Sequence, residues 1–267
     1  MFDDFSQSLQ PRWTQTCIGG GSLSINDSAL RMTLPAIEPG TYADAQIDDY
    51  AGLARSAFPW QPPLRMEVRA RSSLPAAQAS SSIANHDILR GTAGFGFWNY
   101  PFSVRGDILF LPEAVWFFYA SPPSNMALVP NIPGWGWKAQ VVHSMRPAAL
   151  AASFPTALSM LWARMSGETQ HAARWLQTVS GASEALITAD MENWHTYTLE
   201  WRQGAARFWV DGIHILTAPH PPARPLGFVA WLDNQYAIAT PRGVLRFGAV
   251  PCQPQWFEID SVRIEPC

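Results

Sequence analysis

The sequence predicts an all-β protein, a sandwich or barrel of antiparallel strands, interrupted by one helical insertion. Three observations support this prediction. Apolar and polar residues alternate along WHTYTLEWRQGAARFWVDG, Trp194 to Gly212, as in strands with one buried face. Many other short runs follow one another between turn residues, which is typical of sandwiches and barrels. Between about 147 and 181 the spacing of apolar residues becomes helical.

Short strands fill the first half of the chain. Each is an apolar or alternating run that ends near Gly, Pro, Asn or Asp. We predict strands at 22–27, 29–35, 41–48, 64–73, 93–100, 107–111 and 114–121. Two loops are expected, one at 74–87, which is small and polar, and one at 121–137, which is rich in Pro and Gly.

The segment 147–181 predicts two helices. Pro155 suits the first residue of a helix that continues through TALSMLWARM. Apolar residues between 172 and 179 recur at helical spacing, and Gly181 can end this second helix. The segment is too short to bury a core of its own, so we expect a single domain, 1–267, with an insertion.

After the insertion the strand pattern resumes. In the stretch 194–212, Gly204 is free to take a positive φ in a turn, and Asp211-Gly212 is a strong hairpin signal. We interpret the aromatic residues of this stretch as core residues. Further strands are expected at 213–216, 226–238, 243–250 and 256–266.

Composition excludes several classes of function. The net charge is −3, the only lysine is Lys138, and no basic run suggests a nucleic-acid surface. No stretch of about 18 apolar residues suggests a membrane span.

The three cysteines predict unpaired thiols, and the histidines lack the spacing of a transition-metal site. The start MFDDFSQSLQPRW lacks the features of a secretory signal, so with Met1 as the native start a cytoplasmic protein is expected.

Three segments resemble the laminarinase-type glycoside hydrolases of family 16, within the concanavalin A-like lectin and glucanase superfamily. The stretch 194–212 is similar to that family's aromatic-His-x-Tyr-x-x-x-Trp strand and its aromatic-Val-Asp-Gly hairpin. FEIDSVRIEP resembles the closing strand, and FDDFSQ resembles the opening segment. The resemblance implies a concanavalin A-like jelly roll of two antiparallel sheets, one of them curved around a cleft for glycans.

The resemblance fails at the catalytic motif. Retaining hydrolases need two carboxylates about 5 Å apart, and this family places them on one strand as Glu-x-Asp-x-x-Glu. The equivalent strand should lie in GDILFLPEAVWFFYAS, which retains only Glu113, with Asp107 at its edge. One carboxylate cannot perform the two-step displacement alone. We therefore expect glycan binding that is noncatalytic or weakly catalytic.

The segment WLDNQY provides the main candidate site. Alternation along this strand places three side chains on one face: Trp231, Asp233 and Gln235. Together they combine a flat apolar ring with polar groups, as a sugar requires. Glu113 and Asp233 are also the candidate catalytic carboxylates. We predict that the following ligand-binding residues converge on one concavity: Trp98, Asn99, Glu113, Trp135, Trp231, Asp233 and Gln235.

Relatives in the resembled family often hold a calcium ion on the convex side, next to the terminal strands. The matching residues in this sequence are Asp3 or Asp4, together with Asp260. Calcium requires several oxygen ligands, and these carboxylates supply only part of such a set.

Two other functions stay open at this point. The first is a diverged glycoside hydrolase whose carboxylate pair has moved, such as Glu113 with Asp233. The second is a binding protein or enzyme for a hydrophobic small molecule, which the aromatic, lysine-poor composition favours. Fold likeness alone does not choose among the three.

Overall fold

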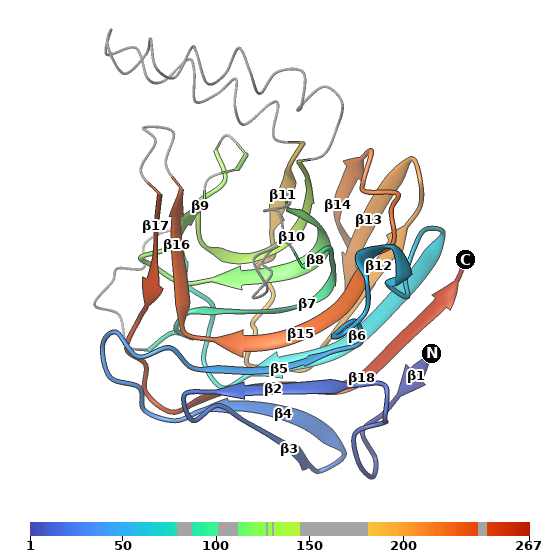
Figure 1. Ribbon diagram of the computed structural model, residues 1–267. Coiled ribbons are helices and arrows are strands. Elements are labelled where there is room, and N and C mark those ends of the chain that lie inside the picture. The colour runs from blue at the N-terminus through green and yellow to red at the C-terminus, as the bar shows by residue number, and fades with distance from the viewer. Residues whose placement is uncertain (79–86, 101–111, 127, 130, 145–180, 240–244) are drawn as a thin grey trace, which may run out of the picture.

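The computed structural model describes residues 1–78, 87–100, 112–126, 128–129, 131–144, 181–239 and 245–267. In these residues the protein is built from two large antiparallel sheets that pack face to face (Figure 1). The predicted all-β jelly-roll sandwich is confirmed. The predicted helices within 147–181 and the predicted strand 107–111 lie outside the described residues. None of the described helices is long and apolar enough to cross a membrane.

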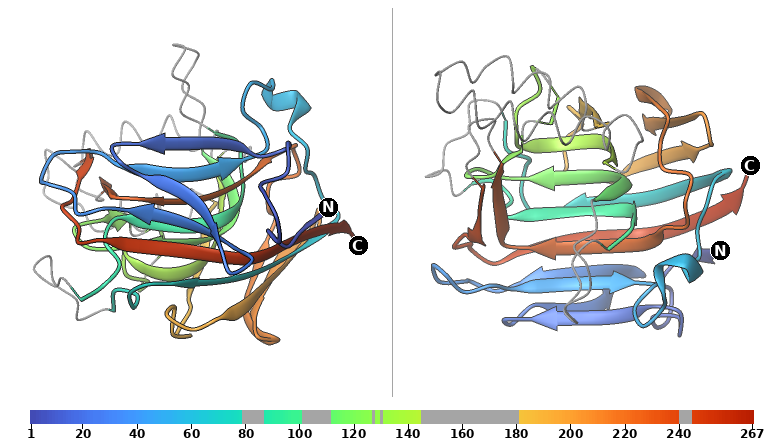
Figure 2. Two further views of the ribbon diagram at one scale, coloured as in Figure 1. Left: turned by 90° about the horizontal axis from the view of Figure 1, so that it is seen from below. Right: turned by 45° about the horizontal axis from the view of Figure 1, so that its top comes forward.

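The first sheet has eight strands in the order β14-β13-β12-β6-β18-β4-β3, and β1 also pairs with β18. Because Phe2 of β1 lies opposite Arg263 of β18, the two ends of the chain lie side by side (Figures 1 and 2). The strands are β1 (Phe2–Asp3), β3 (Ser22–Asn26), β4 (Ala29–Leu34), β6 (Leu64–Ser72), β12 (His195–Trp201), β13 (Ala205–Val210), β14 (Ile213–Pro219) and β18 (Gln255–Pro266).

The second sheet has seven strands in the order β11-β10-β8-β7-β15-β5-β2. They are β2 (Thr14–Ile18), β5 (Asp44–Asp48), β7 (Thr92–Trp98), β8 (Glu113–Ala120), β10 (Gly136–His143), β11 (Ser183–Leu186) and β15 (Gly227–Asp233). A short 3-10 helix, η1 (Arg55–Ala57), follows β5.

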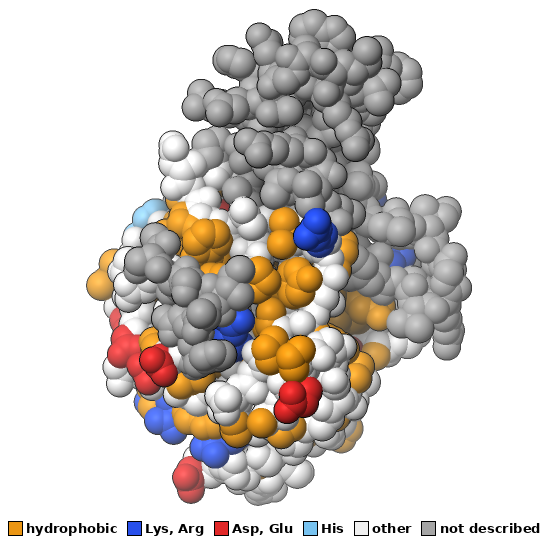
Figure 3. Space-filling view, turned by 90° about the vertical axis from the view of Figure 1, so that its left-hand side faces the viewer, with side chains coloured by type: hydrophobic (Ala, Val, Ile, Leu, Met, Phe, Trp, Pro, Cys, Tyr) orange, Lys and Arg blue, Asp and Glu red, His pale blue; other side chains and the backbone are white. Residues whose placement is uncertain are grey.

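A third, small sheet stands at the ends of the larger strands. It contains β9 (Asn125–Met126), β16 (Gln235–Ala239) and β17 (Leu245–Ala249). Hydrophobic side chains reach the surface on this side of the molecule (Figure 3), and Phe247 of β17 is 55% exposed.

Aromatic side chains fill the space between the two large sheets. Phe97 of β7 lies 5.3 Å from Trp201 of β12, measured between ring centroids, and Phe117 of β8 lies 5.3 Å from Phe208 of β13. Burial alternates along the strands, as on β6, where every second residue is buried. The interpretation of the aromatic residues in 194–212 as core residues is confirmed for Tyr197 and Trp201.

The hairpin between β13 and β14 also matches the sequence prediction. Asp211 and Gly212 both take positive φ, 50° and 77°, as the two central residues of a type I′ turn do. The turn carries the chain from β13 directly into β14.

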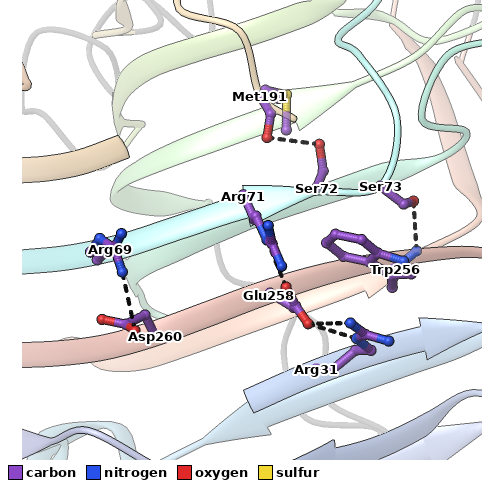
Figure 4. A network of polar contacts seen from close by, with 9 residues as sticks. All are labelled: Arg31, Arg69, Arg71, Ser72, Ser73, Met191, Trp256, Glu258 and Asp260. Atoms are coloured by element: carbon purple, nitrogen blue, oxygen red, sulfur yellow. Dashed lines mark hydrogen bonds and ion pairs between the residues drawn. The ribbon is translucent and has the colours of Figure 1, made fainter. Parts of the chain in front are cut away.

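The side of the eight-stranded sheet that is turned away from the core carries a network of arginines, carboxylates and a tryptophan (Figure 4). Glu258 is only 2% exposed and accepts hydrogen bonds from Arg31 at 2.7 Å and Arg71 at 2.8 Å. The guanidinium of Arg31 lies over the ring of Trp256, 4.7 Å from its centroid. The network therefore satisfies its buried charge internally, and we call it the arginine ladder.

Candidate functional site

We use the term outer face for the side of the seven-stranded sheet that is turned away from the core. Successive side chains of a strand point to opposite sides of the sheet, and this alternation shows which residues belong to the outer face. Phe95 and Phe97 of β7 point into the core, so Thr92, Trp98 and the glycines between them belong to the outer face. Cross-strand partners share a face, which extends this assignment to β8, β15, β5 and β10.

Four aromatic residues of the outer face form what we call the tryptophan cluster: Trp98, Trp116, Phe118 and Trp231. They come from β7, β8 and β15 and belong to a hydrophobic group separate from the core. Trp116 lies at the centre, with ring centroids 5.8 Å from Trp98, 5.3 Å from Phe118 and 5.2 Å from Trp231. The cluster is thus a nearly continuous group of aromatic rings across three strands, in which Trp98 and Trp116 are partly exposed and Phe118 and Trp231 are buried.

Two glycines of β7 make room for this cluster. A Cβ atom at Gly94 would lie 2.9 Å from Cη2 of Trp231, and a Cβ atom at Gly96 would lie 2.6 Å from Cβ of Trp116. Glycine inside a strand permits close approach by a ligand or another backbone. In the structure, tryptophan side chains from the neighbouring strands also occupy that space.

Hydrogen bonds fix the orientation of the three indole rings. The Nε1–H of Trp98 donates to the hydroxyl of Tyr50 at 2.8 Å. The Nε1–H of Trp116 donates to Oε1 of Gln140 at 2.6 Å. Trp231 donates to Oγ1 of Thr92 at 2.8 Å. The rings are therefore held in place before any ligand binds, which lowers the entropic cost of stacking against one.

Carboxylates lie beside the cluster on β5 and β15. Asp44 and Asp233 are direct cross-strand partners, 6% and 7% exposed. Asp48, also buried, lies further along β5 on the same face. Oδ1 of Asp233 accepts hydrogen bonds from Oγ1 of Thr92 at 2.7 Å and from the backbone N–H of Gln235 at 3.0 Å.

Burial and mutual repulsion separate the proton affinities of this pair. Burial, followed by the negative charge of Asp233, raises the pKa of Asp44 to about 8. Burial also raises the pKa of Asp233, but its hydrogen bonds from Thr92 and Gln235 oppose the increase and leave the pKa at about 6. Near pH 7 the pair therefore holds one proton, mainly on Asp44, which is the charge state of an acid beside a base.

A second polar group borders the cluster on β10 and β11. Gln140, which holds Trp116, donates from Nε2 to Glu184 at 2.8 Å. Lys138 donates from Nζ to the other oxygen of Glu184 at 2.8 Å and to the carbonyl of Pro133. This chain of contacts links the orientation of Trp116 to a buried ion pair.

The structure brings three of the predicted ligand-binding residues to the outer face: Trp98, Trp231 and Asp233. Gln235 follows them as the first residue of β16, and its side chain is exposed. Its contact with Asp233 is made through the backbone.

The other predicted site residues lie elsewhere, because strand alternation turns them away. Glu113 precedes the outward-facing Ala114, so it points to the opposite side, where Nε2 of His143 lies 3.2 Å from its Oε1. Asn99 is buried and accepts a hydrogen bond from the backbone of Glu113. Glu113 and Asp233 therefore do not form a catalytic pair across one face.

Trp135 and Trp137 also differ from the sequence prediction. Trp135 packs against the core, and its Nε1–H donates to the carbonyl of Gln78 at 3.0 Å. The predicted loop 121–137 ends earlier than expected, since Trp137 belongs to β10 and is buried between the sheets.

The carboxylates proposed for calcium have protein partners. Asp260 forms an ion pair with Arg69 at 3.2 Å, and Asp3 accepts a hydrogen bond from Nε1 of Trp13 at 2.7 Å. Asp4 is exposed and accepts a hydrogen bond from the backbone of Ser6. Across the described parts of the chain, no group of three or more His, Cys, Asp or Glu side chains is placed to hold a metal. Calcium also accepts backbone carbonyl oxygens as ligands, so the calcium site stays a prediction.

Sequence reasoning missed several residues of the outer face: Asp44, Gln46, Asp48, Trp116, Phe118, Lys138, Gln140 and Glu184. A signal for the first three was present, because the alternation in TYADAQID places them on one face of a strand. The pairing of β5 with β15, which brings Asp44 opposite Asp233, leaves no mark in the sequence.

Comparison with known proteins gives a fold and no sequence family. No protein-family profile matches the sequence, and no curated protein sequence matches it. Solved structures do match. A β-1,3-1,4-glucanase (lichenase) derived from a mouse hindgut metagenome has a TM-score of 0.54 and 13% identity, over 100% of this chain and 99% of its own.

Two further structures show the same likeness. The β-glucanase of Bacillus licheniformis has a TM-score of 0.52 and 10% identity, over 100% of this chain and 98% of its own. The GlcNAcα1-4Gal-releasing endo-β-galactosidase of Clostridium perfringens has a TM-score of 0.53 and 13% identity, over 99% of this chain and only 61% of its own. The protein therefore has the concanavalin A-like jelly-roll fold of these glycanases.

Proposed function

We propose that the protein binds a carbohydrate on the outer face of the seven-stranded sheet. The observation that carries this proposal is the tryptophan cluster, which gathers four aromatic rings outside the core beside buried carboxylates. The rings offer apolar faces for stacking against a sugar, and carboxylates and amides bind its hydroxyl groups.

The structural neighbours support a carbohydrate ligand. They include a lichenase, a β-glucanase and an endo-β-galactosidase, and each shares its fold with nearly the whole of this chain. Their identities of 10–13% do not extend their substrates to this protein, so the glycan has to be found by experiment.

Binding can be tested with a glycan array, followed by calorimetry on the glycans that bind. Trp231→Ala removes one stacking face, so we expect affinity to fall about fivefold or more, or about 1 kcal/mol. Trp256→Ala is the matched control, because Trp256 lies on the opposite sheet in the arginine ladder. Equal affinity in wild-type protein and a folded Trp231→Ala variant would exclude this site.

A second candidate function, glycoside hydrolysis, is favoured by one specific observation. Asp44 and Asp233 face each other across two strands, and directly opposite Cβ atoms in antiparallel pairs lie about 4.5–5.5 Å apart. Carboxyl groups about 5–5.5 Å apart are the arrangement of retaining hydrolases. By contrast, the outward positions of β8 carry Ala114, Trp116, Phe118 and Ala120.

In this mechanism the two carboxyl groups have different roles. Asp44, protonated near pH 7, donates its proton to the leaving glycosidic oxygen as the bond from that oxygen to the anomeric carbon breaks. Asp233, ionised at the same pH, attacks the anomeric carbon. Water then displaces Asp233 and returns a proton to Asp44, so the overall reaction consumes one water.

Variants of the pair separate binding from hydrolysis. If the protein hydrolyses chromogenic glycosides, Asp233→Asn should retain affinity and lose turnover by about 100-fold or more. Turnover should be highest between about pH 6 and about pH 8, where Asp233 is ionised and Asp44 protonated. If wild-type protein shows no measurable turnover and Asp233→Asn loses affinity, the function of the site is binding without hydrolysis. Binding only of apolar compounds would favour a pocket for a hydrophobic small molecule.

A further inference from the structure

Arg90 is fixed in the interior at the end of the sandwich, just before β7. Its backbone N–H donates to Oε1 of Gln255 at 2.8 Å, and its carbonyl accepts from Nε2 of the same side chain at 2.7 Å. The next residue, Gly91, exchanges hydrogen bonds of 2.9 Å with Ser121. Because the backbone is held on both sides, the direction of the Arg90 side chain is set by the fold.

The guanidinium at the end of this side chain is buried and charged. Arg90 is 3% exposed, and its Nε and Nη1 atoms have no hydrogen-bond acceptor among the described residues. Within the same residues no carboxylate forms an ion pair with it. An arginine does not lose its proton in proteins, so it cannot remove this charge as a buried lysine or histidine can.

The neighbouring ionisable groups do not neutralise Arg90. They are the hydroxyl of Tyr119 and the thiol of Cys252. Burial raises the pKa of the Cys252 thiol to about 11 and raises the pKa of Tyr119 above its usual range. Both groups are therefore uncharged at neutral pH. The hydroxyl of Tyr119 is already engaged, since it donates to the carbonyl of Leu89 at 2.6 Å.

We propose that Arg90 binds a small inorganic anion, of the size and charge of chloride, inside the end of the sandwich. A negative charge and a hydrogen-bond acceptor are what the buried guanidinium lacks, and water would supply only the acceptor. The ligand is small because the residue is almost completely enclosed. The proposed site is separate from the outer face, because Gln255 and Tyr119 belong to the core side of their strands.

Anion-dependent thermal stability provides the first test. Chloride is exchanged for methanesulfonate at constant sodium concentration and ionic strength. We expect the Tm of wild-type protein to rise with chloride and then saturate, by about 2–4 °C or more, since a ligand of the folded state stabilises it by mass action. Arg90→Gln should abolish this dependence, whatever its own Tm.

A matched control is Arg31→Gln. Arg31 is also an arginine beside an aromatic ring, but its charge is neutralised by Glu258. This variant should keep the chloride dependence of the wild-type protein. A Tm that is indifferent to chloride in wild-type protein, or that responds equally in Arg90→Gln, would overturn the proposal.

Crystals of the wild-type protein give a test that does not depend on a variant. After replacement of chloride by bromide, an anomalous peak should lie within hydrogen-bond distance of Nε or Nη1 of Arg90. A bromide peak elsewhere, with none at Arg90, would contradict the proposal even if Arg90→Gln failed to fold.

Discussion

Asp44 shows how a single residue links the outer face to folding. Its pKa is about 8 in the folded protein, because it is buried opposite Asp233, whereas its ordinary value is 3.8. Between these two pH values the folded state holds a proton that the unfolded state has lost. The free energy of unfolding contributed by Asp44 therefore decreases as pH rises, by up to about 1.4 kcal/mol per pH unit.

This argument predicts the behaviour of Asp44→Asn. Asparagine has a similar shape but no charge, so the variant should match the wild-type protein near pH 4 and exceed its stability near pH 8. Urea unfolding at several pH values measures the difference. Asp260→Asn serves as a control, because Asp260 is partly exposed and paired with Arg69. Parallel stability curves for wild-type protein and Asp44→Asn would show that Asp44 ionises normally.

At this scale the sequence predicted only part of the site. Trp231 and Asp233 were found because their spacing places them on one face of a strand, and the structure agrees. Glu113 was selected by its position in the resembled motif, although alternation turns it inward. Asp44 was missed because its importance depends on its cross-strand partner, which is 189 positions away in the sequence and is fixed only by the fold.

At the scale of elements, β7 determines the shape of the tryptophan cluster. Its outward positions alternate with Phe95 and Phe97, and two of them are glycines that leave space for rings from β8 and β15. The strand thus provides a floor of backbone on which Trp116 and Trp231 can lie close together.

Gly96→Ala tests this role of β7. The new methyl group would lie 2.6 Å from Cα and Cβ of Trp116, and the backbone φ of 144° is unfavourable for residues with a side chain. We expect a loss of stability of about 1–3 kcal/mol in urea unfolding, as for other overpacked positions. Gly204→Ala is the control, because a Cβ atom there would meet no atom within 4 Å. Equal stabilities for the two variants would contradict the packing argument.

Most strands could be predicted because their alternation is visible in the sequence. The strands of 194–219 follow the expected order, and Asp211 and Gly212 both take positive φ in the turn between β13 and β14. Gly204, in the turn between β12 and β13, does not take the positive φ that the sequence suggested. The start of β10 was missed, since Pro and Gly in PGWGW indicated a loop that continued through Trp137. In the structure Gly136, with φ of 103°, begins the strand and Trp137 is part of the core.

At the scale of the whole molecule, the two sheets share one core but have different outer faces. The seven-stranded sheet carries an aromatic cluster beside buried carboxylates. The eight-stranded sheet carries the arginine ladder, in which Glu258 forms ion pairs with two arginines (Figure 4). We infer that the first face serves ligand binding and the second serves stability.

Glu258→Gln and Trp231→Ala together test this division. Glu258→Gln keeps the shape of the side chain but removes its charge from between Arg31 and Arg71, so we expect a loss of about 1–3 kcal/mol in the free energy of unfolding. Because the two outer faces are separated by the core, glycan affinity should stay unchanged at temperatures where the variant is folded.

Trp231→Ala should show a much larger relative effect on glycan affinity, because its ring belongs to the tryptophan cluster. Calorimetry with the best glycan and urea unfolding, applied to both variants and the double variant, give the two quantities. Sites this far apart should act independently, so the double variant should show the sum of both stability changes within about 0.5 kcal/mol. A fall in glycan affinity in Glu258→Gln similar to that in Trp231→Ala would mean that the ligand binds the arginine ladder, or that the two faces are coupled through the core.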